Sequence, residues 1–164
     1  MARLMALDVG EARIGVAISD ATGFLASPYT TLHVTRDEAQ TWTAIQRLIN
    51  ETGAEGLVIG LPISLDGEIR SQGRRIQAFA ERLKEHITIP VTFWDERLST
   101  VEAERLLAER EEAEQGKRDR AGGGRKRRRT GRRRRQQEVD ALAATVILQE
   151  YLDHHLSKTK GADV

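Results

Sequence analysis

The fold is decided by RLMALDVG (residues 3–10), which is followed directly by EARIGVAISD (residues 11–20). Both runs are apolar and of strand length, and the short polar connection between them contains glycine, so together they predict a β-hairpin. Asp8 is the only carboxylate of the first run. An ionised acid in an apolar strand is costly unless a cation or hydrogen bonds compensate it. Asp8 is therefore a candidate functional residue. The alternative is that Asp8 is a turn residue whose carboxylate accepts hydrogen bonds from backbone N–H groups.

The rest of the chain alternates between strand and helix patterns. A third extended piece over residues 24–34 contains Pro28, which suits an edge strand or a bulge. The expected helices cover about residues 37–51, 69–83, 99–109 and 138–155, and the expected strands cover residues 56–61 and 87–94. We therefore expect an α/β fold with one mixed five-stranded sheet flanked by helices. Its parts are a three-stranded antiparallel meander and two parallel strands.

Length and composition limit the class of protein. The 164 residues suffice for a single domain, which we place at residues 1–155, followed by a disordered tail at residues 156–164. No apolar run approaches the roughly 20 residues of a membrane span, and Asp8 interrupts any signal-peptide pattern. We expect a cytoplasmic protein with no membrane partner. The absence of cysteine excludes disulfides, thiolate zinc sites and a cysteine nucleophile.

The formal net charge of +1 conceals a strong asymmetry. Residues 116–137 contain twelve Lys or Arg and one acid, a local net charge of +11, so the remainder carries −10. With three consecutive glycines and no apolar periodicity, this segment predicts a flexible loop suited to the phosphates of RNA and single strands. A solubilising loop and a nuclear-localisation signal are the alternatives. The candidate nucleic-acid-binding residues are Arg13, Arg97, Arg125, Lys126, Arg127, Arg128, Arg129, Arg132 and Arg133.

Three further acids stand at positions where solubility alone does not explain them. Asp95 and Glu96 follow the last predicted strand, and Asp140 lies among apolar neighbours in the first turn of the last predicted helix. Ligands collect at the strand ends of open α/β sheets, and converging carboxylates repel one another unless cations intervene. Oxygen ligands without cysteine favour Mg²⁺ or Mn²⁺, which in pairs stabilise the attacking and leaving oxygens of a phosphodiester.

Each of these groups also has an ordinary structural explanation. Asp140 could favour the dipole of its helix, a contribution of roughly 0.3–1 kcal/mol. Asp95 could accept a hydrogen bond in a turn, and Glu96 could form a surface ion pair with Arg97 that is worth little. Arg13 could reach a phosphate or a neighbouring acid, and its ordinary alternative is a surface ion pair. We favour a metal site because all three acids occur together with an arginine-rich segment.

The aromatic residues and histidines give weaker signals. Trp94 lies on a predicted strand beside the candidate site, and its role is left open. His154 and His155 stand at the end of the last predicted helix, where cationic side chains favour the dipole. We assign these two histidines no chemistry.

Four motifs in series resemble the YqgF (RuvX) family, with matching order and spacing over nearly the whole of residues 1–155. They are Asp8-Val9-Gly10 through Arg13-Ile14-Gly15-Val16-Ala17, then Val58-Ile59-Gly60-Leu61-Pro62, then Asp95-Glu96-Arg97-Leu98-Ser99-Thr100-Val101-Glu102-Ala103, and Val139-Asp140-Ala141-Leu142-Ala143-Ala144 to Leu148-Gln149-Glu150-Tyr151-Leu152. Any one of these motifs is weak, whereas the series is specific.

The resemblance implies an RNase H-like fold related to the Holliday-junction resolvases. It also implies the family's proposed activity, a metal-dependent nuclease that trims the 5′ end of precursor 16S ribosomal RNA. By this match Asp8, Glu96 and Asp140 are the candidate catalytic metal ligands, and Asp95 is the next candidate. In the resolvase relatives the second acid comes from the strand that corresponds to residues 58–61. Here that strand has no acid, so the acid must come from the neighbouring strand.

Two classes of function follow from these expectations. The first is a Mg²⁺- or Mn²⁺-dependent nuclease that acts on structured RNA in ribosome biogenesis, such as precursor rRNA or a ribosomal particle. Four-way junction DNA is the rival substrate for the same chemistry. The second is an RNA- or ribosome-binding maturation factor whose acids form no productive site. The sequence is compatible with a monomer or a homodimer and with endo- or exonucleolytic cleavage.

Overall fold

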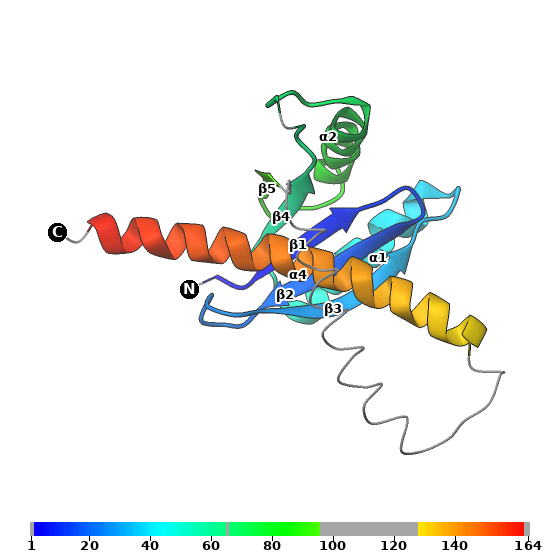
Figure 1. The fold of residues 1–164 in the computed structure, drawn as a ribbon, viewed down its shortest axis with the longest axis horizontal. Helices are drawn as coiled ribbons and strands as arrows, with labels where there is room; N and C mark the ends of the chain where they lie inside the picture. Colours follow the sequence, from blue (N-terminus) through cyan, green and yellow to red (C-terminus); the bar gives the residue numbers. More distant parts are fainter. Residues whose placement is uncertain (1, 65, 96–127, 163–164) are drawn as a thin grey trace, which may run out of the picture.

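The computed structural model describes residues 2–64, 66–95 and 128–162, with side chains over residues 2–64, 66–95 and 135–155 (Figure 1). The expected helix at residues 99–109 lies outside these ranges. Within them, no helix combines the length and the apolar character that crossing a bilayer requires. The elements are β1 (Leu4–Val9), β2 (Arg13–Ser19), β3 (Ala26–His33), α1 (Glu38–Thr52), β4 (Gly56–Leu61), α2 (Ser71–Lys84), β5 (Val91–Asp95) and α4 (Arg128–Ala162).

The five strands form one mixed sheet in the order β3-β2-β1-β4-β5. β1 pairs antiparallel with β2, and β2 with β3, whereas β1 pairs parallel with β4, and β4 with β5. This is the predicted meander with two added parallel strands. β4 is the most completely buried strand, since all six of its residues are buried, as expected for an apolar strand covered on both faces.

Helices cover the two faces of the sheet through separate apolar cores. On one face, Met5 and Leu7 of β1 pack in a cluster with residues of α1 and α2, such as Ile45 and Ile76. On the other face, Ala6 of β1 packs with α4 in the cluster Ala6, Ala17, Ala26, Val58, Ala144, Ile147, Leu148 and Leu152. Figure 1 shows α4 crossing the sheet on this second face. Residues of even number on β1, including Asp8, therefore belong to the α4 face.

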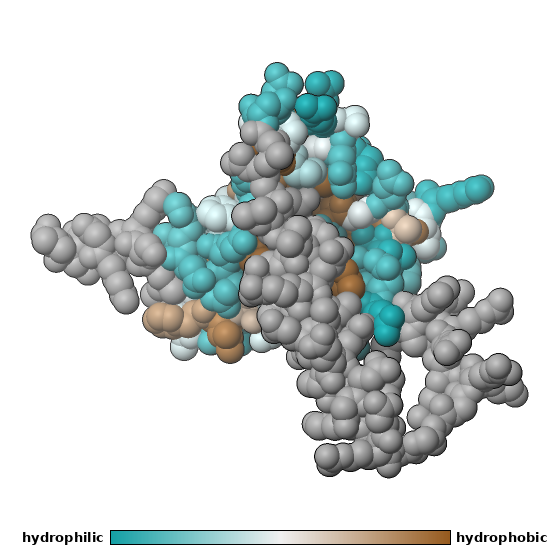
Figure 2. Space-filling view, viewed as in Figure 1, coloured by the Kyte–Doolittle hydropathy of each residue, from teal (hydrophilic) through white to brown (hydrophobic). Residues whose placement is uncertain are grey.

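β3 is an edge strand, as Pro28 predicts. Its register against β2 shifts between Val16 and Ala17, whose partners are Thr30 and Pro28. A proline and a bulge both hinder another strand from pairing with the edge. Among the coloured residues in the view of Figure 2, hydrophilic ones predominate, with an apolar area where the β2–β3 connection lies in Figure 1. The exposed large apolar residues of the described ranges are Phe24, Leu25 and Tyr29.

The structure corrects the bounds of the last helix. It begins at Arg128 and ends at Ala162, whereas the sequence predicted a helix over residues 138–155 between a flexible loop and a disordered tail. Residues 128–137, expected within the loop, are helical, and Gln137 accepts a 2.8 Å hydrogen bond from the Thr31 hydroxyl of β3. The prediction relied on apolar periodicity, but arginine and glutamine are strong helix formers without it.

Three other element boundaries agree with local sequence signals. Asp37 caps α1 by accepting a 3.1 Å hydrogen bond from the Ala39 N–H, and Gly53 ends the helix with φ of 70°. β5 is shorter than predicted because it begins at Val91, immediately after Pro90. Proline lacks the N–H that a strand ladder needs, so pairing begins after it.

Candidate active site

Gly15 of β2 fixes the position of α4 on the sheet. A Cβ atom at this position would overlap the backbone carbonyl of Asp140 and would lie 3.0 Å from the Ala141 nitrogen. The obstacle is helix backbone, which cannot move aside as the end of a flexible side chain can. Only glycine therefore allows α4 to approach β2 this closely, and the approach brings Asp140 onto the sheet.

Asp8 lies on the neighbouring strand at the same level as Gly15. The two residues are Cα partners in the antiparallel β1–β2 ladder, and Asp8 belongs to the α4 face by strand alternation. Asp8 and Asp140 are both partly exposed. The structure thus brings an acid from the first strand and an acid from the last helix to one place, around the missing side chain of Gly15.

Arg13 pairs with one of these acids. Its Nε donates a hydrogen bond of 2.7 Å to Oδ2 of Asp140, and this contact is also an ion pair. The Asp140 side chain is 18% exposed and that of Arg13 is 35% exposed. Of the two partners predicted for Arg13, the structure shows the neighbouring acid. The pair compensates a partly buried carboxylate and leaves it accessible from solvent.

Asp95 lies on the other face of the sheet. It ends β5 and is the Cα partner of Leu61 on β4. Phe93 packs against the α1–α2 core and Trp94 against the α4 core, so alternation assigns Asp95 to the α1–α2 face. The structure does not bring Asp95 together with Asp8 and Asp140. Glu96 and Arg97 lie outside the described residues.

The donor set at this place suits a hard divalent cation. Asp8 and Asp140 supply carboxylate oxygens, which Mg²⁺ and Mn²⁺ prefer. Within residues 2–64, 66–95 and 135–155, no group of three acidic or histidine side chains is arranged to hold a metal ion. A third ligand from those ranges is therefore absent, and the remaining predicted ligand, Glu96, falls outside them.

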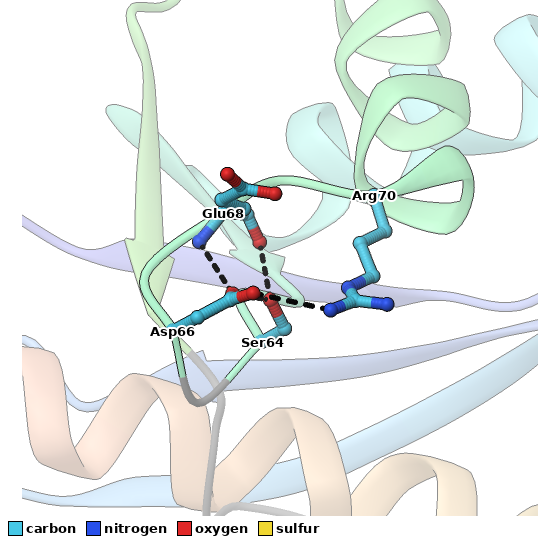
Figure 3. A network of polar contacts seen from close by, with 4 residues as sticks. All are labelled: Ser64, Asp66, Glu68 and Arg70. Carbon is cyan, nitrogen blue, oxygen red and sulfur yellow. Dashed lines mark hydrogen bonds and ion pairs between the residues drawn. The ribbon is translucent and has the colours of Figure 1, made fainter.

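Hydrogen bonds to the Asp66 carboxylate stabilise the loop after β4 (Figure 3). Asp66 accepts hydrogen bonds from the Ser64 hydroxyl, from the Glu68 N–H at 3.0 Å and from Nη2 of Arg70 at 3.1 Å. The Ser64 hydroxyl, followed by the Glu68 N–H, lowers the pKa of Asp66 below its ordinary value of 3.8. Gly67 adopts φ of 83° at the turn. These contacts stabilise the loop that leaves the carboxyl end of β4, where open sheets bind ligands.

The predicted basic residues of the arginine-rich segment fall in two groups. Arg128, Arg129, Arg132 and Arg133 belong to the first turns of α4, and their side chains are not described. Arg125, Lys126 and Arg127 lie outside the described residues.

Sequence reasoning missed the importance of Gly15, which it treated only as part of a motif. Its position opposite Asp8 in a predicted hairpin is the signal that could have indicated it.

Comparison of the structure with solved proteins identifies the class of fold. The chain resembles Thermus thermophilus RuvC with a TM-score of 0.51 and 10% identity, covering 94% of this chain and 96% of that chain. It resembles RuvC of the same organism in complex with a Holliday junction substrate with a TM-score of 0.50 and 12% identity, covering 96% and 97%. At these identities the likeness concerns the fold alone. The protein has an RNase H-like fold.

Sequence comparison then gives the family. The chain belongs to the RuvX family, described as Holliday junction resolvase, whose family model matches residues 2–122. A relative from Thermoanaerobacter pseudethanolicus is 38% identical over 156 residues, 95% of this chain and 99% of its own length. One from Roseiflexus is 40% identical over 154 residues, 92% of this chain and 94% of its own length. Both relatives carry the name "Putative pre-16S rRNA nuclease".

Proposed function

We propose that this protein is a divalent-metal-dependent nuclease that processes the 5′ end of precursor 16S rRNA. Membership of the RuvX family and the names of its relatives support phosphodiester hydrolysis as the reaction class. The observation that carries the proposal for this chain is the meeting of Asp8 and Asp140 around Gly15. Two acids from opposite ends of the chain share one partly exposed place on an RNase H-like sheet.

Asp8, Asp140 and Glu96 are the proposed metal ligands. Asp95 is not among them, because alternation along β5 assigns it to the face opposite Asp8. Bound Mg²⁺ or Mn²⁺ would lower the pKa of an attacking water and stabilise charge on the phosphate. Asp8 and Asp140 would orient this centre, since β1 and α4 are packed elements that fix where their carboxylates lie.

Arg13 has two proposed tasks at this centre. Its ion pair holds the Asp140 carboxylate in one orientation. Its half-exposed guanidinium also places positive charge where a phosphate would approach Asp8 and Asp140, which favours binding of a polyanion. The arginines at the start of α4 would extend this positive field along the nucleic-acid backbone.

A cleavage assay tests the proposal. Labelled precursor 16S rRNA is incubated with the protein and Mn²⁺ or Mg²⁺, with EDTA, and with the variants Asp8→Asn and Asp140→Asn. We expect shortening at the 5′ end that disappears with EDTA and falls by at least about 100-fold in both variants, because removing a group that only orients a metal ligand already costs about 10–100-fold. Glu81→Gln is the matched control, since Glu81 is an exposed acid on α2 paired with Lys84.

The same assay separates the rival functions. Four-way junction DNA is tested at the same salt concentration, because phosphate binding depends strongly on salt. Preferential cleavage of the junction would show that the substrate is junction DNA and not RNA, and the proposed reaction class would stand. RNA binding without metal-dependent cleavage in any condition would contradict the nuclease and support a maturation factor. A cytoplasmic location and the choice between monomer and homodimer stay predictions.

A further inference from the structure

Four aromatic rings gather where α4 passes β5. The Trp94 ring centroid lies 5.7 Å from that of Tyr151 and 5.2 Å from that of His154. Tyr151 and His155 stack, with centroids 4.0 Å apart and an interplanar angle of 27°. His154 and His155 are themselves in contact at 5.6 Å. We call Trp94, Tyr151, His154 and His155 the ring cluster.

The ring cluster is anchored at its base and open at its outer end. Trp94 and Tyr151 are partly buried and pack against the apolar core between the sheet and α4. The Trp94 indole N–H donates a 3.2 Å hydrogen bond to Oε2 of Glu150, and Nδ1 of His155 lies 2.8 Å from the Tyr151 carbonyl oxygen. His154 and His155 are exposed. Rings held in this way lose little conformational entropy when a ligand stacks on them.

The ring cluster lies on the same face of the sheet as the candidate active site. Trp94 and Asp8 both belong to the α4 face, and only β4 separates their strands. Two strand spacings of about 4.8 Å place the strand of Trp94 about 10 Å from that of Asp8. His154 stands 14 residues beyond Asp140 on α4, about 21 Å along the helix at about 1.5 Å per residue. A nucleic-acid strand at Asp8 and Asp140 would therefore reach the outer end of the ring cluster with a nucleotide several positions along the strand.

The charges beside the ring cluster determine which part of a nucleotide, the base or the phosphate, can bind there. Glu150 and Asp153 lie on the same turns of α4 as the two histidines, and their negative charge disfavours a phosphate there. Aromatic and imidazole faces instead stack well on a flat, neutral base. Packing of α4 on β5 is already provided by Trp94 and Tyr151, and it does not require two exposed imidazoles.

We propose that the ring cluster is a stacking site for an unpaired nucleobase of the substrate strand. The base belongs to the same strand as the phosphate that lies at Asp8 and Asp140, several nucleotides along, so this inference rests on the proposed nuclease function. The site would favour single-stranded or splayed RNA over continuous duplex, because a paired base cannot present its face to a protein ring.

Tryptophan fluorescence tests the inference directly. The chain has two tryptophans, and Trp42→Phe leaves Trp94 as the sole reporter, with an aromatic ring kept beside Phe79. A short single-stranded RNA and an abasic oligonucleotide with the same number of phosphates are titrated in EDTA, where no cleavage occurs. We expect the RNA to bind about 5- to 100-fold more tightly and to change Trp94 emission, as base stacking predicts.

Substitutions on the Trp42→Phe background locate the effect. His154→Ala with His155→Ala should abolish most of the preference for RNA over the abasic oligonucleotide, and His154→Phe with His155→Phe should retain it. His86→Ala is the matched control, because His86 is an exposed imidazole on the opposite face, where in the unmodified protein it stacks at 5.4 Å on the ring of residue 42. Circular dichroism checks that α4 stays helical in each variant.

The outcomes separate this inference from the proposed function. Equal binding of the two oligonucleotides, or an unchanged preference in the double alanine variant, overturns the stacking site even if the enzyme cleaves precursor rRNA. A base-dependent preference that disappears only in the double alanine variant supports the stacking site even if no cleavage is found.

Discussion

A hydrogen atom in place of a methyl group at position 15 lets the backbone of α4 reach β2. Gly15 thereby joins Asp8, its partner on β1, to Asp140, whose carbonyl occupies the space of the missing Cβ. The Arg13 guanidinium then compensates the charge of Asp140. At the scale of single residues, the candidate active site depends on one absent side chain and one ion pair.

The first prediction concerns Gly15→Ala. The added methyl group meets helix backbone, so α4 must shift, and we expect a loss of about 3 kcal/mol in the free energy of unfolding. Urea denaturation measures it. Gly67→Ala is the control, because Gly67 has open space around its Cβ direction and φ of 83°, for which a cost of about 1 kcal/mol is expected. Equal unfolding midpoints for Gly15→Ala and the unmodified protein would contradict the placement of α4.

The second prediction concerns the ion pair. A double-mutant cycle with Arg13→Ala and Asp140→Asn should give a coupling free energy of about 1 kcal/mol, because this pair is partly buried and well aligned. Denaturation of the four proteins measures the coupling. The comparison cycle uses Lys84→Ala and Glu81→Gln, an exposed pair on α2, for which roughly 0.3–0.5 kcal/mol is expected. If the coupling free energy between Arg13 and Asp140 is no larger than that of the exposed pair, Arg13 does not hold the Asp140 carboxylate in place.

At the scale of elements, α4 and the loop after β4 define the surroundings of the candidate site. The middle of α4 is apolar, and Ala144, Ile147 and Leu148 are fully buried against the sheet. That part of the helix was predictable from its period. The basic beginning of the helix has no apolar face to indicate it, and its sequence therefore predicts a loop over residues 128–137.

The third prediction is a pH dependence in the loop of residues 64–70. The pKa of Asp66 is lowered by the Ser64 hydroxyl, so the folded loop binds a proton less readily than the unfolded chain. The resulting stabilisation is present above pH 3.8, the ordinary pKa, and is lost as the pH falls through the lower pKa of the folded state. An NMR titration of the Asp66 carboxyl carbon should show a midpoint below 3.8 that rises in Ser64→Ala.

Ser71→Ala is the matched control for this titration. Ser71 begins α2 and is exposed, a short distance along the chain from the loop. It should leave the Asp66 midpoint unchanged. A midpoint in Ser64→Ala equal to that of the unmodified protein would show that the serine hydroxyl does not lower the pKa.

At the scale of the whole molecule, charge is divided between an acidic body and a basic segment. The net charge of +11 over residues 116–137 contrasts with −10 for the remainder. Each phosphate that a lysine or arginine neutralises releases counterions, so binding of nucleic acid should weaken steeply with salt. The acidic remainder repels the same polyanion and favours one orientation of binding.

The fourth prediction follows from this asymmetry. Arg132→Gln with Arg133→Gln should reduce the slope of log K against log salt for single-stranded RNA by about 1.4, or about 0.7 for each phosphate that is no longer neutralised. Fluorescence anisotropy at several salt concentrations measures the slope. Arg47→Gln with Arg82→Gln is the control, because these exposed arginines pair with Glu51 and Glu38 on α1. An unchanged slope in the first variant would exclude these arginines from the interface.

The sequence by itself determined the order of the elements, the mixed sheet and the candidate acids. These depend on local signals: the two apolar runs joined by a glycine-containing connection in residues 3–20, Pro28 in the third extended piece and the apolar run at residues 56–61. Such signals act over a few residues, so they can be recognised without knowing which segments meet.

Only the tertiary structure decided which of these residues share a face. It joined Asp8 to Asp140, gave Arg13 its acidic partner, assigned Asp95 to the opposite face and gathered His154 and His155 around Trp94. The face of Asp95 follows from alternation along β5. The other results depend on how α4 packs across the sheet, and that packing follows from contacts between distant segments. No periodicity within one segment carries this information, because the missing Cβ of Gly15 matters only once α4 lies above it.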